Sequence, residues 1–155
     1  MRTAYHVLAY LIALEVVIQA AVISFAVFGL SKWITGGGVL DKATLESHSA
    51  EFPGVIGFAI HGFNGQNVVP ILGILLLLVS FFAKVPRGIM WAGLVLLLVL
   101  AQVFLGIFGH GIPELGVLHG LNALVLFSVA VIAARRARVP AELSVAAPLG
   151  AAHVS

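Results

Sequence analysis

Two histidines lie inside long apolar segments of the chain, and their surroundings are alike. His61 stands in Gly-Phe-Ala-Ile-His-Gly-Phe-Asn-Gly (57–65), and His119 stands in Gly-Val-Leu-His-Gly-Leu-Asn-Ala (116–123). An imidazole in hydrocarbon loses the water that binds its ring nitrogens, so ionisable side chains are rare inside a membrane and mark functional sites there. These two side chains are therefore the strongest candidates for chemistry in the sequence.

Each histidine is followed by an asparagine three residues later and by a small residue four residues later. On a helix, residues at these offsets share the histidine's face. Small residues leave a flat surface beside a ring nitrogen, and a porphyrin fits on such a surface. The predicted cofactor-contacting residues are the histidines His61 and His119, the small residues Gly57, Gly65, Gly116 and Ala123, and the ring-orienting Asn64 and Asn122. The alternative is that each histidine only forms a hydrogen bond to a neighbouring helix.

Composition places the chain in the membrane. Of its 155 residues, 61% are hydrophobic and 9% are charged, and the mean hydropathy is +1.16, which is too apolar for a soluble domain of this length. The absence of cysteine excludes a disulfide framework, thiolate metal sites and c-type haem attachment. The net charge of +2 comes from a few clustered basic residues, so a nucleic-acid partner is not expected.

Four apolar segments predict an all-α integral membrane protein with a four-helix bundle in residues 1–138. The spans are expected at about 5–30, 54–83, 88–108 and 113–134. The first span is longer than a signal-peptide core and carries Glu15 and Gln19, so we interpret it as a retained helix. Pro70 is expected to bend the second span.

The positions of the basic residues predict the topology. They cluster before the first span, between the second and third, and after the fourth, at Arg2, Lys84, Arg87, Arg135, Arg136 and Arg138. By the positive-inside rule both termini are cytoplasmic, in the cytoplasmic membrane. The loop 31–53 is then external, and Asp41 is expected to cap a short helix through Ala50 that covers the mouth of the bundle. Residues 139–155 are predicted to be a flexible cytoplasmic tail.

With this topology the two histidines lie at one depth. At about 1.5 Å per residue, His61 is about 10 Å and His119 about 9 Å below the outer end of its span. Because these two spans run in the same direction, their imidazoles can clamp a planar macrocycle, each giving one nitrogen to its iron. We therefore expect haem b with His61 and His119 as metal ligands, an arrangement that favours electron transfer over oxygen chemistry. Another flat pigment or a quinone in the same cleft remains an alternative.

Two further polar sites lie close to these spans. His110, at the outer end of the third span, is expected to contact the cofactor from outside the coordination sphere, for example at a propionate. Glu15 and Gln19 are one helical turn apart, so the carboxyl either bonds to the amide or is held protonated. The alternative functions for this pair are a proton relay and a quinol contact.

From about residue 5 to residue 136, the chain resembles one four-helix half of the haem A synthase family. The resemblance rests on four pieces, namely Gly57-Phe-Ala-Ile-His61 after the outer loop, Lys84-Val-Pro-Arg87, Gln102-Val-Phe-Leu-Gly106 and Leu118-His119-Gly-Leu-Asn-Ala123. In that family the histidines on helices two and four of each half bind haem, which implies this role for His61 and His119. The family's outer loop also carries an important glutamate, a place that Glu46 or Glu51 could take.

The same resemblance bears on the reaction. A haem A synthase has two such halves, and many members have a cysteine pair in a loop, whereas this chain has one half and no cysteine. The resemblance therefore implies haem modification or haem handling only by a homodimer that rebuilds eight helices.

Three functions remain open from the sequence. The first is electron transfer near the outer face, between a reductant such as quinol in the bilayer and an acceptor outside it. The second is a non-redox accessory or assembly subunit of a respiratory membrane complex, and the third is the half-synthase homodimer. An electron carrier or a subunit is favoured over a stand-alone enzyme, and no catalytic residue is predicted.

Overall fold

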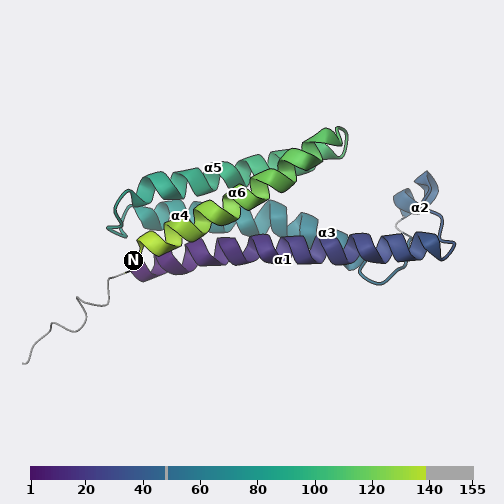
Figure 1. The fold of residues 1–155 in the computed structure, drawn as a ribbon, viewed down its shortest axis with the longest axis horizontal. Helices are drawn as coiled ribbons and strands as arrows, with labels where there is room; N and C mark the ends of the chain where they lie inside the picture. Colours follow the sequence, from purple (N-terminus) through teal and green to yellow (C-terminus); the bar gives the residue numbers. More distant parts are fainter. Residues whose placement is uncertain (48, 139–155) are drawn as a thin grey trace, which may run out of the picture.

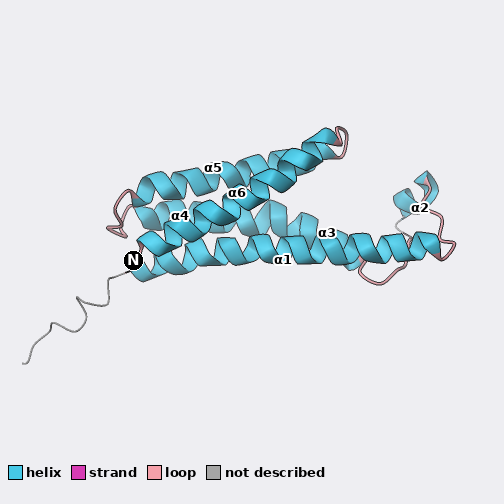
Figure 2. Ribbon diagram, viewed as in Figure 1, coloured by secondary structure: helices cyan, strands magenta, loops and turns pink. Residues whose placement is uncertain are grey.

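The computed structural model describes residues 1–47 and 49–138, and these are helical throughout apart from their connections (Figure 1, Figure 2). The elements in chain order are α1 (Arg2–Thr35), α2 (Lys42–Ser47), α3 (Ile56–Phe63), the π-helical turn η1 (Asn64–Val68), α4 (Val69–Ser80), α5 (Gly88–Gly109) and α6 (Glu114–Arg136). No strand occurs in the described part of the chain. The predicted tail, 139–155, lies outside the described residues.

Four helices are long and apolar enough to cross a membrane, as predicted. They are α1, the continuous segment Ile56–Ser80, α5 and α6. They run alternately up and down, so that α3, η1 and α4 point in the same direction as α6 (Figure 1). The all-helical class and the four helices of membrane-spanning length and apolarity are therefore confirmed, with bounds that differ from the predicted ones by a few residues.

The largest difference in bounds concerns α1, which continues to Thr35 instead of ending near residue 30. The apolar pattern ends near residue 30, but no helix-breaking residue follows until Gly36 and Gly37, and Gly37 has a φ of +97°. A helix of 34 residues is about 50 Å long, against about 30 Å of hydrocarbon. Its projecting end packs against the following loop, where the Trp33 and Phe52 ring centroids are 5.8 Å apart.

The second span contains a π-helical turn that the sequence analysis did not predict. This turn, η1, lies directly before Pro70, which occupies the first turn of α4. A proline inside a helix has no N–H, and its ring clashes with the carbonyl group four residues earlier. The wider turn before Pro70 accommodates that ring, and such turns occur often at functional sites. Here the π-helical turn begins three residues after His61.

The tightly packed core lies at the end of the bundle where α1 begins and α6 ends. Small side chains allow the helices to approach closely there, and Tyr5 Oη donates a hydrogen bond to the carbonyl oxygen of Gly88 over 3.1 Å. Buried residues of this core include Ala9, Ile12, Ala13, Leu76, Ala92, Val95, Ala130, Ala133 and Ala134. Large apolar side chains cover the outer surface of the helices, as a lipid-facing bundle requires.

The short loop helix α2 forms with the predicted cap. Asp41 Oδ1 accepts hydrogen bonds from the backbone N–H and the hydroxyl of Thr44, both over 2.8 Å, and these donors lower the pKa of the Asp41 carboxyl. The helix ends at Ser47, not at Ala50. It lies beside the projecting end of α1 and none of its residues is buried (Figure 1), so the prediction that it covers the mouth of the bundle is wrong.

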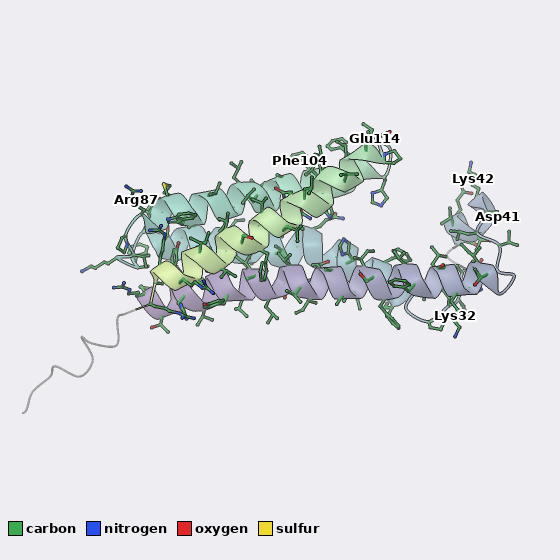
Figure 3. The ribbon with its side chains drawn as sticks, in the orientation of Figure 1. Lys32, Asp41, Lys42, Arg87, Phe104 and Glu114 are labelled. Atoms are coloured by element: carbon green, nitrogen blue, oxygen red, sulfur yellow. The ribbon has the colours of Figure 1, made fainter. Side chains whose placement is uncertain are left out.

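The basic clusters meet at one end of the bundle. Arg2 Nε donates to the carbonyl oxygen of Ala137 over 3.0 Å, and an Arg138 guanidinium nitrogen donates to Tyr10 Oη over 2.8 Å. Arg87 lies at this end, whereas Lys32 and Glu114 lie toward the other (Figure 3). The structure thus places the three basic clusters, on which the predicted topology depends, at the same end of the bundle.

We expect a reporter fused to the C-terminus to read cytoplasmic and a reporter inserted after Gly37 to read external, because short basic segments stay on the cytoplasmic side. The measurement is the activity of paired reporters, one active only inside and one only outside the cell. A fusion at Val85, between α4 and α5, serves as the control and should read cytoplasmic. The reverse pattern would overturn the predicted topology.

Candidate functional site

His61 on α3 and His119 on α6 face each other in the half of the bundle that lies away from the basic clusters. Their ring centroids are 6.2 Å apart, and the ring planes are inclined by 61°. Both side chains are half-buried. The two helices run in the same direction and each places its histidine near its own first residue (Figure 1). The prediction that the two imidazoles lie at the same level is therefore confirmed.

A cavity of about 650 Å³ surrounds the two histidines. All four spanning helices contribute to its wall, which is mainly apolar, and its volume falls in the range of about 300–1,000 Å³ that is usual for cofactor and small-molecule sites. The predicted residues Gly65, Gly116, Ala123 and His110 also line it. Wall residues that the prediction did not include are, among others, Gln19, Gln66, Gly62, Gly106 and Gly120.

The His119 ring is held by α5. Its Nδ1 lies 3.0 Å from the carbonyl oxygen of Gln102. A carbonyl oxygen only accepts, so Nδ1 carries the proton and Nε2 keeps its lone pair. Gly106, one turn further along α5, gives the ring room, since a Cβ atom there would lie 3.2 Å from His119 Cε1.

The His61 ring is held by α1, mainly through Gln19. The Gln19 side-chain amide is oriented so that each of its atoms has a suitable hydrogen-bond partner. Its nitrogen lies 2.7 Å from His61 Nδ1. Its oxygen accepts hydrogen bonds from Asn64 Nδ2 over 2.8 Å and from the Gly65 N–H over 3.2 Å. The backbone carbonyl oxygen of Gln19 is 3.3 Å from the same Nδ1. Asn64 Nδ2 also donates to Glu15 Oε2.

The asparagines do not hold the rings, contrary to the prediction. Asn122 Nδ2 donates to Gln102 Oε1 over 2.6 Å and to the carbonyl oxygen of Leu98 over 2.9 Å, and Asn64 bonds to α1. Gln19 and Gln102 contact the rings instead. Gln19 does so through its side chain, whereas Gln102 does so through its backbone carbonyl group, a contact for which the residue type in the sequence gives no signal.

The expected bond between Glu15 and Gln19 is also replaced. The Glu15 carboxyl accepts from Asn64 across the helix interface, because the π-helical turn begins at Asn64 and the asparagine faces α1. A fixed i, i+4 pattern on one helix cannot predict a partner supplied by another helix.

Two predicted contact residues lie elsewhere than expected. Gly57 is buried against α1, where a Cβ atom would lie 2.8 Å from the carbonyl oxygen of Val22, and it does not line the cavity. Its position favours helix packing over cofactor contact. His110 is exposed at the cavity edge, and its Nδ1 lies 2.9 Å from the carbonyl oxygen of Gly106 in its own helix.

Replacing Gly57 with Ala is expected to destabilise the bundle by about 1–3 kcal/mol, because the added methyl group meets the α1 backbone. Gly93→Ala is the matched control, since a Cβ atom at Gly93 meets nothing within 4 Å. Unfolding by denaturant in detergent should show a lower midpoint for Gly57→Ala only. Equal midpoints for the two variants would contradict the close packing at Gly57.

The metal-binding capacity of the site is limited to the two imidazoles. In residues 1–47 and 49–138, no group of three or more His, Cys, Asp or Glu side chains could hold a metal ion. A metal bound between His61 and His119 would need further ligands from a cofactor or from water.

Comparisons of the chain with models of protein families, with curated proteins and with solved structures found no match. The resemblance to one half of a haem A synthase stays a prediction from the sequence.

Proposed function

We propose that this protein is a membrane haem b protein that transfers electrons, with His61 and His119 as the two axial ligands of the iron. The observation that carries the proposal is the separation of 6.2 Å between the two ring centroids inside a cavity. A metal–nitrogen bond of about 2 Å on each side, plus about 1 Å from each nitrogen to its ring centre, predicts about 6 Å for two imidazoles on one metal.

The donor set favours haem over a metal ion bound by the protein alone. Two imidazoles leave most of a coordination sphere empty, and the described residues place no third His, Cys, Asp or Glu side chain with them. A porphyrin supplies four nitrogens in one plane and needs only two axial ligands from the protein. Two histidines in a mainly apolar cavity are thus suited to this cofactor.

The chain's own residues would bind and orient the group. The carbonyl group of Gln102 keeps the proton of His119 on Nδ1, which leaves Nε2 for the metal. Gly65, Gly116 and Ala123 present little side-chain volume to the cavity. Apolar lining residues exclude water, and the exposed His110 is in place to meet a propionate at the cavity edge. When bound, a haem with both axial positions filled supplies one-electron chemistry.

The position of the cavity supports the choice of partners. It lies in the half of the bundle away from the basic clusters, which by the positive-inside rule is the outer half. We therefore propose a reductant from the bilayer, such as quinol, and an acceptor on the outer side of the cytoplasmic membrane.

A non-redox accessory subunit of a respiratory complex is the second candidate function. The observation that favours it is that each histidine already has a hydrogen-bond partner on a neighbouring helix, at Gln19 or Gln102. Packing histidines do not require a cavity of about 650 Å³ between them, so we rank this function below haem binding. The half-synthase homodimer stays an expectation of the sequence resemblance.

The test is the visible spectrum of the protein purified in detergent from cells supplied with haem. We expect about one haem per chain and a reduced-minus-oxidised spectrum of the low-spin b type. Extraction and identification of the bound group distinguishes haem b from another pigment or a quinone. A folded protein without haem would overturn the proposal and leave the accessory-subunit function.

A further inference from the structure

The second span carries an amide side chain that has no partner in the described residues. Gln66 lies in the middle of the π-helical turn η1, is exposed, and belongs to the wall of the cavity. It forms no hydrogen bond with any residue that the structure describes. All the other Asn and Gln side chains in the spans do so, namely Gln19, Asn64, Asn67, Gln102 and Asn122.

The depth of Gln66 makes an unpaired amide unfavourable. From Ile56 to Gln66 the span rises about 15 Å, at about 1.5 Å per residue, which is about half the thickness of the hydrocarbon layer. Lipid offers no hydrogen bonds to an amide there, so the amide loses its water without replacement. Gln66 therefore requires a hydrogen-bonding group from outside the chain.

A second amide with an unused donor lies at the same level on α5. The innermost cavity residues of the second span and of α5 are Val69 and Val99, both buried, and Gln66 and Gln102 each lie three residues further from the core. Gln102 Oε1 accepts from Asn122 over 2.6 Å, whereas Gln102 Nε2 forms no hydrogen bond with a described residue. Two neighbouring spans thus direct unused amide groups to one part of the cavity.

A glycine lies one helical turn from each of these amides. Gly62 precedes Gln66 by four residues and Gly106 follows Gln102 by four residues, and both glycines line the cavity. A Cβ atom at Gly62 would meet nothing within 4 Å, and one at Gly106 would meet the His119 ring. The space beside the amides is therefore flat-walled, and it adjoins His119.

The cavity opens toward the bilayer beside Gln66. The outer surface of the bundle at this depth faces lipid, and Gln66 is both exposed and part of the cavity wall. α3 packs on α1, whereas α5 packs on α4 and α6, and the α5–α6 hairpin diverges from α1 away from the basic clusters (Figure 1). The nearby cavity residues Phe58, Val103 and Ile107 are apolar. A ligand with an alkyl chain can therefore reach Gln66 directly from the lipid.

We propose that Gln66 and Gln102 bind the head group of a quinone or quinol, which enters the cavity from the bilayer between η1 and α5. The oxygens of a quinone only accept hydrogen bonds, whereas the hydroxyl groups of a quinol also donate. A glutamine amide has a donor and an acceptor on one rotatable group, so Gln66 can hold either redox state. The flat ring suits the glycine-lined walls. That the quinol reduces a bound haem rests on the proposed function, but its binding does not.

The first test measures the affinity of the haem-free protein in detergent for a benzoquinone that carries a ten-carbon alkyl chain. We expect saturable binding that is about 3–10-fold weaker in Gln66→Leu, because one hydrogen bond is lost. Asn67→Leu is the matched control and should bind as the wild type does. Asn67 lies in the same turn, donates to the carbonyl oxygen of Phe63 in its own helix and does not line the cavity. Equal affinities of the wild type and Gln66→Leu, or equal weakening in both variants, would overturn the proposal.

The second test observes the amides directly, by NMR of ¹⁵N-glutamine-labelled protein with Leu variants for assignment. The quinone and its quinol should each shift the side-chain NH₂ signals of Gln66 and Gln102. The signal of Gln19 should stay in place, because its amide is already paired with His61, Asn64 and Gly65. A benzene with the same alkyl chain and no oxygen is the control and should shift none of them. Equal shifts with this compound would reduce the site to apolar filling and overturn the proposal.

The third test separates this inference from the proposed function. Haem-loaded protein should keep the quinone affinity of the haem-free protein, and Gln66→Leu should keep the haem content of the wild type. Loss of quinone binding on haem loading, or loss of haem from Gln66→Leu, would show that Gln66 contacts the cofactor and would overturn the inference alone. A wild-type protein that binds the quinone but no haem would overturn the proposed function and support the inference.

Discussion

Replacing His61 or His119 with Ala is expected to abolish the low-spin haem spectrum and to lower haem affinity by more than about 10-fold. Loss of a residue that merely orients a metal ligand commonly costs 10–100-fold, and here a ligand itself is removed. His61 and His119 form the one pair of facing imidazoles, and no third His, Cys, Asp or Glu side chain stands with them among the described residues, so each variant would leave one position on the metal without its ligand. The measurement is haem per folded protein together with the spectrum at fixed pH.

His6→Ala is the matched control for these two variants. Like them, His6 on α1 contacts a neighbouring helix, since its Nδ1 lies 2.9 Å from the carbonyl oxygen of Ala134. It is at the basic end of the bundle, far along α1 from the cavity. The spectrum of His6→Ala should match that of the wild type. Normal low-spin haem in either ligand variant would contradict the assignment of axial ligands.

The spans and the level of the two histidines could be predicted because each depends on one segment at a time. Hydropathy over about 20 residues identifies a span, and a fixed rise per residue gives the depth of His61 and His119 below its end. The alternating direction of the helices then brings the two rings to one side. No knowledge of contacts between helices is required for these steps.

The partners of the rings could not be predicted in the same way. Gln19 and Gln102 belong to other helices than the histidines that they hold, so the rotation of four helices about their axes decides the contact. The π-helical turn adds a local change that hydropathy does not show, and with it Asn64 faces Glu15.

The roles of the glycines show the same limit. Gly57 and Gly65 are both small residues on the histidine helix, and the sequence assigned both to the cofactor surface. The structure separates them, because Gly57 is pressed against the backbone of α1 and Gly65 borders the cavity. Only the packing of α1 on α3 distinguishes the two.

Replacing Gly65 or Ala123 with Leu is expected to remove most of the bound haem while the protein stays folded. Both residues line the cavity, one turn beyond a histidine. A Cβ atom at Gly65 meets only the side-chain amide of Gln19, at 4.0 Å, so the leucine side chain can extend into the cavity without displacing a helix. There it occupies volume that a macrocycle needs, and close-packed interiors do not yield that volume without cost.

Gly93→Leu is the matched control for these variants, because a side chain at Gly93 points into open space on α5 and Gly93 is not among the cavity residues. Haem per folded protein should fall in Gly65→Leu and Ala123→Leu and stay at the wild-type level in Gly93→Leu. If the histidines only joined helices by hydrogen bonds, a leucine in the cavity would leave their contacts with Gln19 and Gln102 in place. The visible spectrum of the variants would then equal that of the wild type. Full haem occupancy in both cavity variants would show that the macrocycle does not lie between α3 and α6.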